Sequence, residues 1–220
     1  GAFLFALCLP PFSLWWLSPF ILLPVWFTFE KKLSYRRHFM NGFCFGFSIY
    51  ALLFYWIPES VSEIANLNIF LSIILCTTGF AMIGVMYGFL YIVIKFLWDK
   101  KPWLIILIFP GFEWLCLPVF PITIGYAWRG SVGGVQAVDI GGVYFLSSLC
   151  CLYSYLIYLG VKNRTKRNWY WVSALALLST QYIYGSYRIF SIQNSTVLST
   201  LNVSVLQTGI SPIVKRDDTT

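Results

Sequence analysis

Charged residues are scarce in this chain of 220 residues. Only 10% of them are Asp, Glu, Lys or Arg, and 59% are hydrophobic. An average soluble domain is about 25% charged and about 45–50% apolar, so this composition excludes an ordinary soluble globule. The 20% aromatic content is too high for a disordered chain. We therefore predict that most of the chain lies in a lipid bilayer.

Motifs for metals, nucleotides and thiol chemistry are missing as well. The sequence has no P-loop, dinucleotide-binding glycine fingerprint, H-E-x-x-H motif or zinc-ligand spacing. Its cysteines lie in apolar runs without C-x-x-C spacing, which is typical of small buried side chains. His38 lies among basic and aromatic residues without a nearby carboxylate or serine, so we expect an interfacial basic residue. The sequence predicts no metal and no cofactor.

Long apolar runs dominate the chain. A helix needs about 17–25 apolar residues to cross the bilayer. The runs that approach this length are residues 14–29, 41–57, 67–98, 103–118, 132–161 and 169–190, and residues 1–9 form an apolar stub of an earlier span. We predict an all-α polytopic membrane helix bundle over residues 1–190, with a partial first span and six further spans.

Lys and Arg are distributed unevenly between the predicted loops. Eleven of the 15 lie within residues 31–37, 95–101 and 162–167, which alternate loops place on one side of the membrane. The other four lie in segments on the opposite side. Because loops rich in Lys and Arg face the cytoplasm, we expect the other loops and everything after residue 190 to face outward. Nine of the 10 tryptophans lie near the expected interfaces, which supports the same topology. Topology explains the net charge of +7, so we predict no nucleic-acid partner.

The chain changes character after residue 190. Residues 191–200 are polar and typical of a linker, and residues 201–207 alternate apolar and polar side chains, as a short strand does. Turn residues follow at Thr208-Gly209 and Ser211-Pro212. A single strand cannot fold alone. We expect residues 201–220 to be the truncated beginning of an extracytoplasmic domain.

Glu113 is the one acidic residue that falls deep inside a predicted span. An ionisable group at that depth is costly and marks a polar interior or a functional site. Two interpretations stay open: a structural Glu that satisfies backbone groups freed by Pro110, or a substrate-related carboxylate. Pro110, Pro118 and Pro121 make this span a broken one, which membranes tolerate only where protein or a polar cavity covers the backbone.

Three pairs of glycines are spaced four residues apart, a pattern that lets helices approach closely. They are Gly42 and Gly46, Gly84 and Gly88, and Gly130 and Gly134. We interpret them as packing positions within the chain.

Several segments together resemble the apolipoprotein N-acyltransferases, membrane enzymes that acylate the lipid-bearing amino-terminal cysteine of bacterial lipoproteins. N-G-F-C-F-G-F at residues 41–47 with Y-W-I at 55–57 resembles the family's glycine- and phenylalanine-rich third span. E-W-L at 113–115, followed by F-P, G-Y and G-G-V-Y, resembles its E-W-L-R-G to G-x-x-G-V-Y region. Cys116 stands in place of the family's Arg, and Ile122 in place of a Trp.

The end of the chain carries the last part of the resemblance. V-S-V-L-Q-T-G-I-S-P at residues 203–212 is similar to the entry into the family's α/β nitrilase-like (carbon-nitrogen hydrolase) domain. In this motif the matching positions are Gln207, Gly209 and Pro212. The resemblance implies that the catalytic Cys, Glu and Lys lie beyond this fragment, so we expect the fragment alone to be inactive.

The resemblance also implies the reaction and its partners. An acyl chain passes from a phospholipid donor, through a thioester on the enzyme, to a diacylated apolipoprotein acceptor at the bacterial inner membrane, with the C-terminal segment facing the periplasm. The substrate-facing, lipid-facing or structural candidates that it leaves in this chain are Glu113, Trp114, Tyr126, Tyr55 and Trp56. The alternative is a small multipass transporter or channel subunit with Glu113 as its intramembrane carboxylate.

Overall fold

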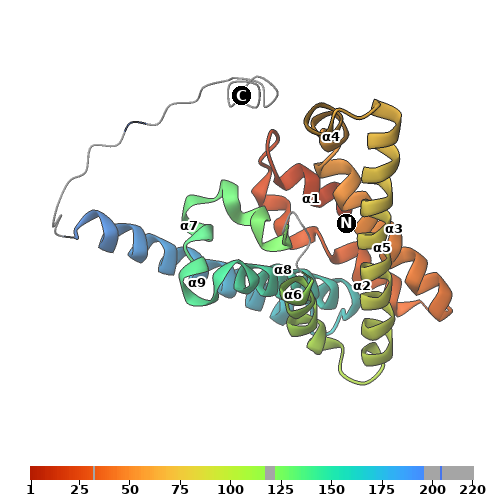
Figure 1. The fold of residues 1–220 in the computed structure, drawn as a ribbon. Coiled ribbons are helices and arrows are strands. Elements are labelled where there is room, and N and C mark those ends of the chain that lie inside the picture. Colours follow the sequence, from red (N-terminus) through yellow and green to blue (C-terminus); the bar gives the residue numbers. More distant parts are fainter. Residues whose placement is uncertain (32, 117–121, 196–203, 205–220) are drawn as a thin grey trace.

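A computed structural model describes the chain except for residues 32, 117–121, 196–203 and 205–220. The described residues form helices and contain no strand (Figure 1). In chain order the elements are α1 (Ala2–Cys8), η1 (Trp15–Phe20), α2 (Leu23–Glu30), α3 (Tyr35–Leu53), α4 (Ile57–Ala65), α5 (Ile69–Trp98), η2 (Pro102–Leu104), α6 (Ile105–Leu115), η3 (Ile124–Gly130), α7 (Val132–Val135), α8 (Val138–Lys162) and α9 (Arg167–Gln193). The all-helical prediction for the membrane part is confirmed over these residues. The strand pattern at 201–207 lies outside them, apart from residue 204.

Two described helices, α5 and α8, are long and apolar enough to cross a membrane by length and composition. A third span is reached if α3 and α4, which are bent by 64° at their junction, count as one. The chain is thus a membrane protein. The expected span at 14–29 is divided into a 3-10 helix and a short α-helix, and α6 is a short apolar helix. The total of six spans stays a prediction.

Helices α3 and α5 pack tightly because glycines remove side chains at their contact. A Cβ atom on Gly42 would lie 2.4 Å from the carbonyl oxygen of Tyr87, and one on Gly46 would meet the ring of the same residue. A Cβ atom on Gly84 of α5 would lie 2.9 Å from the side chain of Phe43 of α3, and one on Gly88 would lie 2.6 Å from that of Phe39. The prediction that these two glycine pairs serve packing within the chain is confirmed.

The basic turn before the third expected span is helical rather than a loop. Helix α3 begins at Tyr35, where Ser34 accepts a hydrogen bond from the backbone N–H of Arg37. His38 is therefore carried inward: its side chain is fully buried and stacks on the ring of Phe29 at 5.1 Å. The expectation of an interfacial basic residue was wrong, because the helix starts six residues before the apolar run and turns this position toward α2.

Two ion pairs mark the opposite ends of the helix bundle. At one end Lys162 of α8 binds Glu30 of α2 at 2.7 Å, and Trp98 at the end of α5 packs nearby against aromatic rings of α2 and α8. At the other end Asp139, at the start of α8, binds Arg188 near the end of α9. The contacts of Lys162 and Trp98 bring residues 31–37, 95–101 and 162–167 to the same end of the bundle, as the distribution of Lys and Arg predicts.

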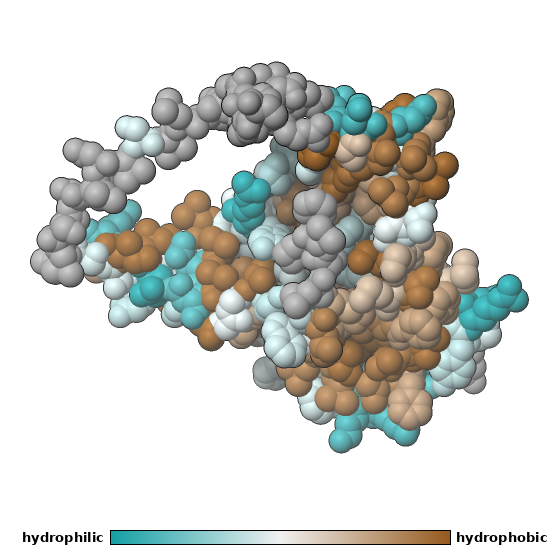
Figure 2. Space-filling model, in the orientation of Figure 1, coloured by the Kyte–Doolittle hydropathy of each residue, from teal (hydrophilic) through white to brown (hydrophobic). Residues whose placement is uncertain are grey.

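A broad hydrophobic surface covers the face of the molecule that Figure 2 presents, with hydrophilic residues above and below it. Helix α5 contributes much of the exposed apolar area. Its exposed side chains include Phe70, Ile74, Leu75, Met82, Phe89 and Phe96. Such an extended apolar surface on a single chain is typical of contact with lipid.

Candidate functional site

Glu113 lies near the end of α6, and its side chain is buried with 6% exposure. Its Oε1 accepts a hydrogen bond of 2.8 Å from the backbone N–H of Ile124, the first residue of η3. The structural interpretation of Glu113 therefore needs a correction, because the backbone group that it satisfies belongs to η3 and not to the region of Pro110. The carboxylate joins two chain segments across residues 117–121.

Helix α8 holds the same 3-10 helix from its other side. The backbone N–H of Gly125 donates a hydrogen bond of 2.9 Å to Oγ of Ser147. A Cβ atom on Gly125 would lie 2.2 Å from the carbonyl oxygen of Val143, so this contact requires glycine. The first turn of η3 is thus fixed by a carboxylate of α6 and a hydroxyl of α8.

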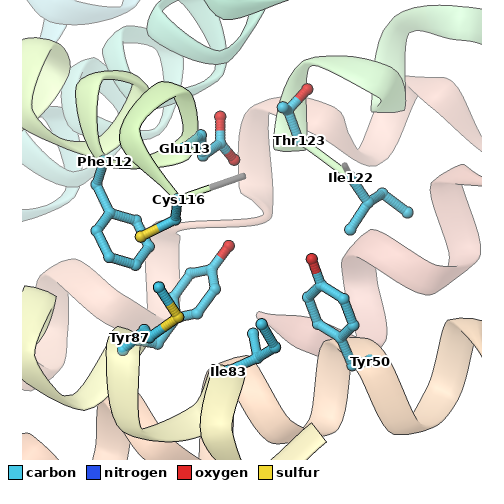
Figure 3. A pocket seen from close by; sticks show the side chains of 9 residues that line it. Tyr50, Ile83, Tyr87, Phe112, Glu113, Cys116, Ile122 and Thr123 are labelled. Atoms are coloured by element: carbon cyan, nitrogen blue, oxygen red, sulfur yellow. The ribbon is translucent and has the colours of Figure 1, made fainter. Parts of the chain in front are cut away.

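A small pocket opens beside Glu113 (Figure 3). Its lining comes from α3, α5, the end of α6 and the segment before η3: Tyr50, Ile83, Met86, Tyr87, Phe112, Glu113, Cys116, Ile122 and Thr123. Figure 3 shows the hydroxyl groups of Tyr50 and Tyr87 directed into this space, with the Glu113 carboxylate on the opposite side. Among the described residues, Oε2 of Glu113 is buried without a hydrogen-bond partner. The pocket therefore presents a carboxylate oxygen and two phenol groups within an apolar wall.

The other predicted site residues do not join Glu113. Trp114, the next residue of α6, is 63% exposed, and Tyr55 and Trp56 are exposed at the bend between α3 and α4. Tyr126 is 41% exposed and lines a separate groove with Arg129. Gln207, Gly209 and Pro212 lie outside the described residues. Of the predicted residues that the structure describes, only Glu113 lines the pocket.

Sequence reasoning missed the two tyrosines of the pocket. Tyr87 lies between the paired glycines of α5, and Tyr50 opens the aromatic run of residues 50–56. A helical projection places Tyr87 on the same face as Gly84. This shared face could have indicated that Tyr87 points toward the interior of the helix bundle. No sequence pattern links Tyr50 to Glu113.

A second polar cluster connects α7, α8 and α9. Gln181 donates to the carbonyl oxygen of Gly134 at 2.7 Å and accepts from the hydroxyl of Tyr153 at 2.7 Å. The hydroxyl groups of Ser131 and Tyr182 form a further hydrogen bond of 2.6 Å. Every polar side-chain group named here has a partner, which is typical of a structural clamp.

The cysteines differ in their access to solvent or lipid. Cys8, Cys76, Cys150 and Cys151 are buried as the sequence predicts, whereas Cys116 is half-buried and Cys44 is exposed. Over the described part of the chain, no group of three or more His, Cys, Asp or Glu residues is arranged to hold a metal ion. A thiol nucleophile needs a base within hydrogen-bond reach. None of the side-chain hydrogen bonds found in the described part of the chain joins a cysteine to a carboxylate or to His38.

Comparison with known proteins identifies a family that this chain matches. Residues 1–156, which include α6, η3 and most of α8, match the family model of the apolipoprotein N-acyltransferase N-terminal domain. An apolipoprotein N-acyltransferase of Rickettsia typhi is 25% identical over 91% of this chain and 43% of its own length. Apolipoprotein N-acyltransferase 1 of Leptospira interrogans is 29% identical over 74% of this chain and 30% of its own length. The chain thus spans less than half the length of these curated relatives.

Proposed function

Because the chain belongs to the apolipoprotein N-acyltransferase family, we propose that it is the membrane domain of an enzyme that acylates the amino terminus of bacterial lipoproteins. The match over residues 1–156 is the observation that carries this proposal. It covers the helices that bear the broad hydrophobic surface and the glycine contact between α3 and α5, together with the Glu113 pocket. A transporter with Glu113 as its coupling carboxylate is disfavoured by the same match.

The proposed reaction is a two-step transfer. A cysteine thiolate attacks the ester carbonyl of a phospholipid, and collapse of the tetrahedral intermediate releases the lysophospholipid and leaves a thioester. The α-amine of the S-diacylglyceryl-cysteine then attacks the thioester, forms an amide and releases the thiol. A glutamate takes the proton of the cysteine thiol and passes it to the oxygen of the departing lysophospholipid, and in the second step it takes a proton from the α-amine and returns it to the thiolate. A lysine stabilises the oxyanion of each tetrahedral intermediate. We place these three residues outside the present chain, in a nitrilase-like domain that begins near residue 201.

The proposed orientation puts the chemistry on the periplasmic side of the inner membrane. The excess of Lys and Arg near residues 31–37, 95–101 and 162–167 supports a cytoplasmic position for that end of the bundle. The ion pair between Asp139 and Arg188 then lies at the periplasmic end, where the chain leaves α9. This end is where the proposed nitrilase-like domain is attached.

We assign Glu113 a positioning role. Its hydrogen bond to the N–H of Ile124 orders the start of η3, which carries Tyr126 and Arg129 to the groove near the bend of α3 and α4. Tyr126, Arg129, Tyr55 and Trp56 are proposed to contact lipid or lipid-bearing substrate, since their side chains are exposed next to apolar surface. Trp114 is proposed to face lipid for the same reason.

An in vitro transfer assay tests the proposal. The full-length protein containing this chain is reconstituted with a phospholipid whose acyl chains carry an isotopic label and with a diacylated lipopeptide. Mass spectrometry then detects the label in amide linkage on the lipopeptide α-amine. The proposal expects labelled product from the full-length protein and none from residues 1–220 alone. Absence of product from an intact, membrane-inserted full-length protein would refute it.

A further inference from the structure

A groove lies at the end of the bundle that carries the Lys162–Glu30 ion pair. One wall is apolar and aromatic: Trp98 and Pro102 come from the segment at the end of α5, and Tyr155 and Leu159 come from one face of α8. Trp26 supports this wall from behind, with its ring 4.7 Å from Tyr155 and 5.5 Å from Trp98. These ring contacts hold the wall in position, and the wall presents an apolar surface to the groove.

The rim of the same groove is cationic and polar. Lys162 is oriented by two neighbours, since its Nζ lies 2.7 Å from a carboxylate oxygen of Glu30 and 3.3 Å from the hydroxyl of Tyr158. Its side chain nevertheless remains 49% exposed. Arg164, two residues further along, also lines the groove, and no carboxylate of the described residues forms an ion pair with it.

The charge around the groove is complementary to a phosphate group. The carboxylate of Glu30 already forms an ion pair with Lys162. Arg164 forms no ion pair with a carboxylate of the described residues, and Lys100 and Lys101 add positive charge directly before Pro102. The hydroxyl of Thr165 and the amide of Asn163 lie on the same rim. Phosphate is bound by such convergent cations and hydrogen-bond donors. Cations between helices, next to an apolar wall, are the arrangement by which membrane proteins hold acidic lipid headgroups.

The groove is separate from the region proposed for acyl transfer. It lies at the C-terminal end of α8, whereas Asp139 and the exit of α9 lie beyond the other end, past a break in the helical backbone at Gly141 and Gly142. The continuous part of α8, residues 143–162, is about 30 Å long. By the Lys and Arg distribution this end faces the cytoplasm, whose adjoining leaflet carries anionic lipids. A lipid held here is therefore not the acyl donor.

We propose that this groove binds an anionic phospholipid of the cytoplasmic leaflet, with its phosphate between Lys162 and Arg164 and an acyl chain along the Trp98–Tyr155 wall. The lipid joins the ends of α5 and α8 and fixes the bundle at the inner membrane surface. The inference rests on the membrane position and orientation of the chain and not on its acyl-transfer activity.

Binding is tested on residues 1–220 in detergent micelles, with phosphatidylglycerol or phosphatidylcholine added and retained lipid measured by native mass spectrometry. We expect phosphatidylglycerol to be retained selectively. Arg164→Gln is expected to lower its apparent affinity about fivefold, the equivalent of about 1 kcal/mol for one cation at the membrane surface. The matched control is Arg167→Gln, which removes the same charge at the start of α9 outside the groove and is expected to change affinity by less than about twofold.

Three results would overturn the inference. Equal retention of the two lipids would show that the headgroup charge is not recognised. Equal losses in Arg164→Gln and Arg167→Gln would show diffuse attraction rather than a site. Displacement of the lipid by excess inorganic phosphate, without any dependence on acyl chains, would assign the groove to free phosphate. Loss of lipid selectivity with intact acyl transfer in the full-length protein would separate this inference from the proposed function.

Discussion

Replacing Glu113 tests the role that its contacts assign to it. Glu113→Ala removes the acceptor that the described part of the chain gives to the buried N–H of Ile124 and leaves that group unsatisfied, which costs roughly 1–3 kcal/mol. Glu113→Gln keeps a carbonyl oxygen where Oε1 accepts the hydrogen bond, and its amide group faces the pocket that Tyr50 and Tyr87 line. We therefore expect the Gln variant to be close to the wild type and the Ala variant to be clearly destabilised.

The assay is thermal unfolding of the purified chain in detergent micelles. For a chain of this length, 1 kcal/mol corresponds to about 2–4 °C. At the middle of the expected range, Glu113→Ala lowers the melting temperature by about 4–8 °C, whereas Glu113→Gln lowers it by less than about 2 °C. Glu63 of α4 is exposed and provides the matched control, because neither its Ala nor its Gln variant should change the melting temperature by more than about 2 °C. Equal destabilisation by Gln and Ala at position 113 would refute the hydrogen-bond account and favour a role for the negative charge.

Three further predictions concern packing, pH and topology. Gly42→Ala should destabilise the chain by about 1–3 kcal/mol because its Cβ would overlap a backbone oxygen of α5, whereas Gly79→Ala, with open space around it, should be neutral or slightly stabilising in the same unfolding assay. The lysine partner of Glu30 holds the pKa of this carboxylate below its usual value. The ion pair of Glu30 and Lys162 therefore stabilises the fold at a pH above about 4.3, the pKa of Glu in the unfolded chain. This stabilisation is lost as the pH falls through the lower pKa that Glu30 has in the folded chain. Between about pH 5 and pH 3 the wild type should lose stability relative to Glu30→Gln. In a chain without its native cysteines, a cysteine at Lys166 should be shielded from impermeant thiol reagents in intact cells, and one at Ser195 should be labelled.

Each of these predictions has a distinct contrary outcome. Equal effects of the two glycine substitutions would show that the α3–α5 contact does not limit stability. Parallel acid unfolding curves for the wild type and the Glu30 variant would show that the ion pair contributes nothing. Labelling of the position in the α8–α9 turn but not of the position after α9 would reverse the membrane orientation.

Much of the helical organisation was predictable because apolar runs and glycine spacing are local signals. The run at residues 67–98 became α5 within two residues of its expected start, and the pairs containing Gly42 and Gly84 became packing positions. The bend after α3 was not predicted. Residues 57–65 form a helix because Pro58 and Glu59 suit its first turn, although residues 58–66 were expected to be an outward-facing segment between two spans.

The candidate site was predictable only as a single residue. Glu113 was identified as a candidate site residue because it is an isolated acidic residue in an apolar run. Its hydrogen-bond partner Ile124 lies 11 residues further along, beyond a segment with two prolines, and no sequence periodicity indicates that contact. Neighbouring residues of the E-W-L motif also differ in exposure, since Glu113 is buried and Trp114 is exposed. Trp114 is exposed and does not line the pocket, because consecutive helical residues point in different directions.

This chain belongs to the apolipoprotein N-acyltransferase family, and the activity proposed for the whole protein is addition of the amide-linked acyl group to lipoproteins. The most direct test is depletion of the protein in its own bacterium, followed by mass spectrometry of the amino-terminal peptides of its lipoproteins. We predict that depletion replaces peptides with three acyl chains by peptides with two, the missing chain being the one on the α-amine. Lipoproteins that keep all three chains after complete depletion would contradict the assignment.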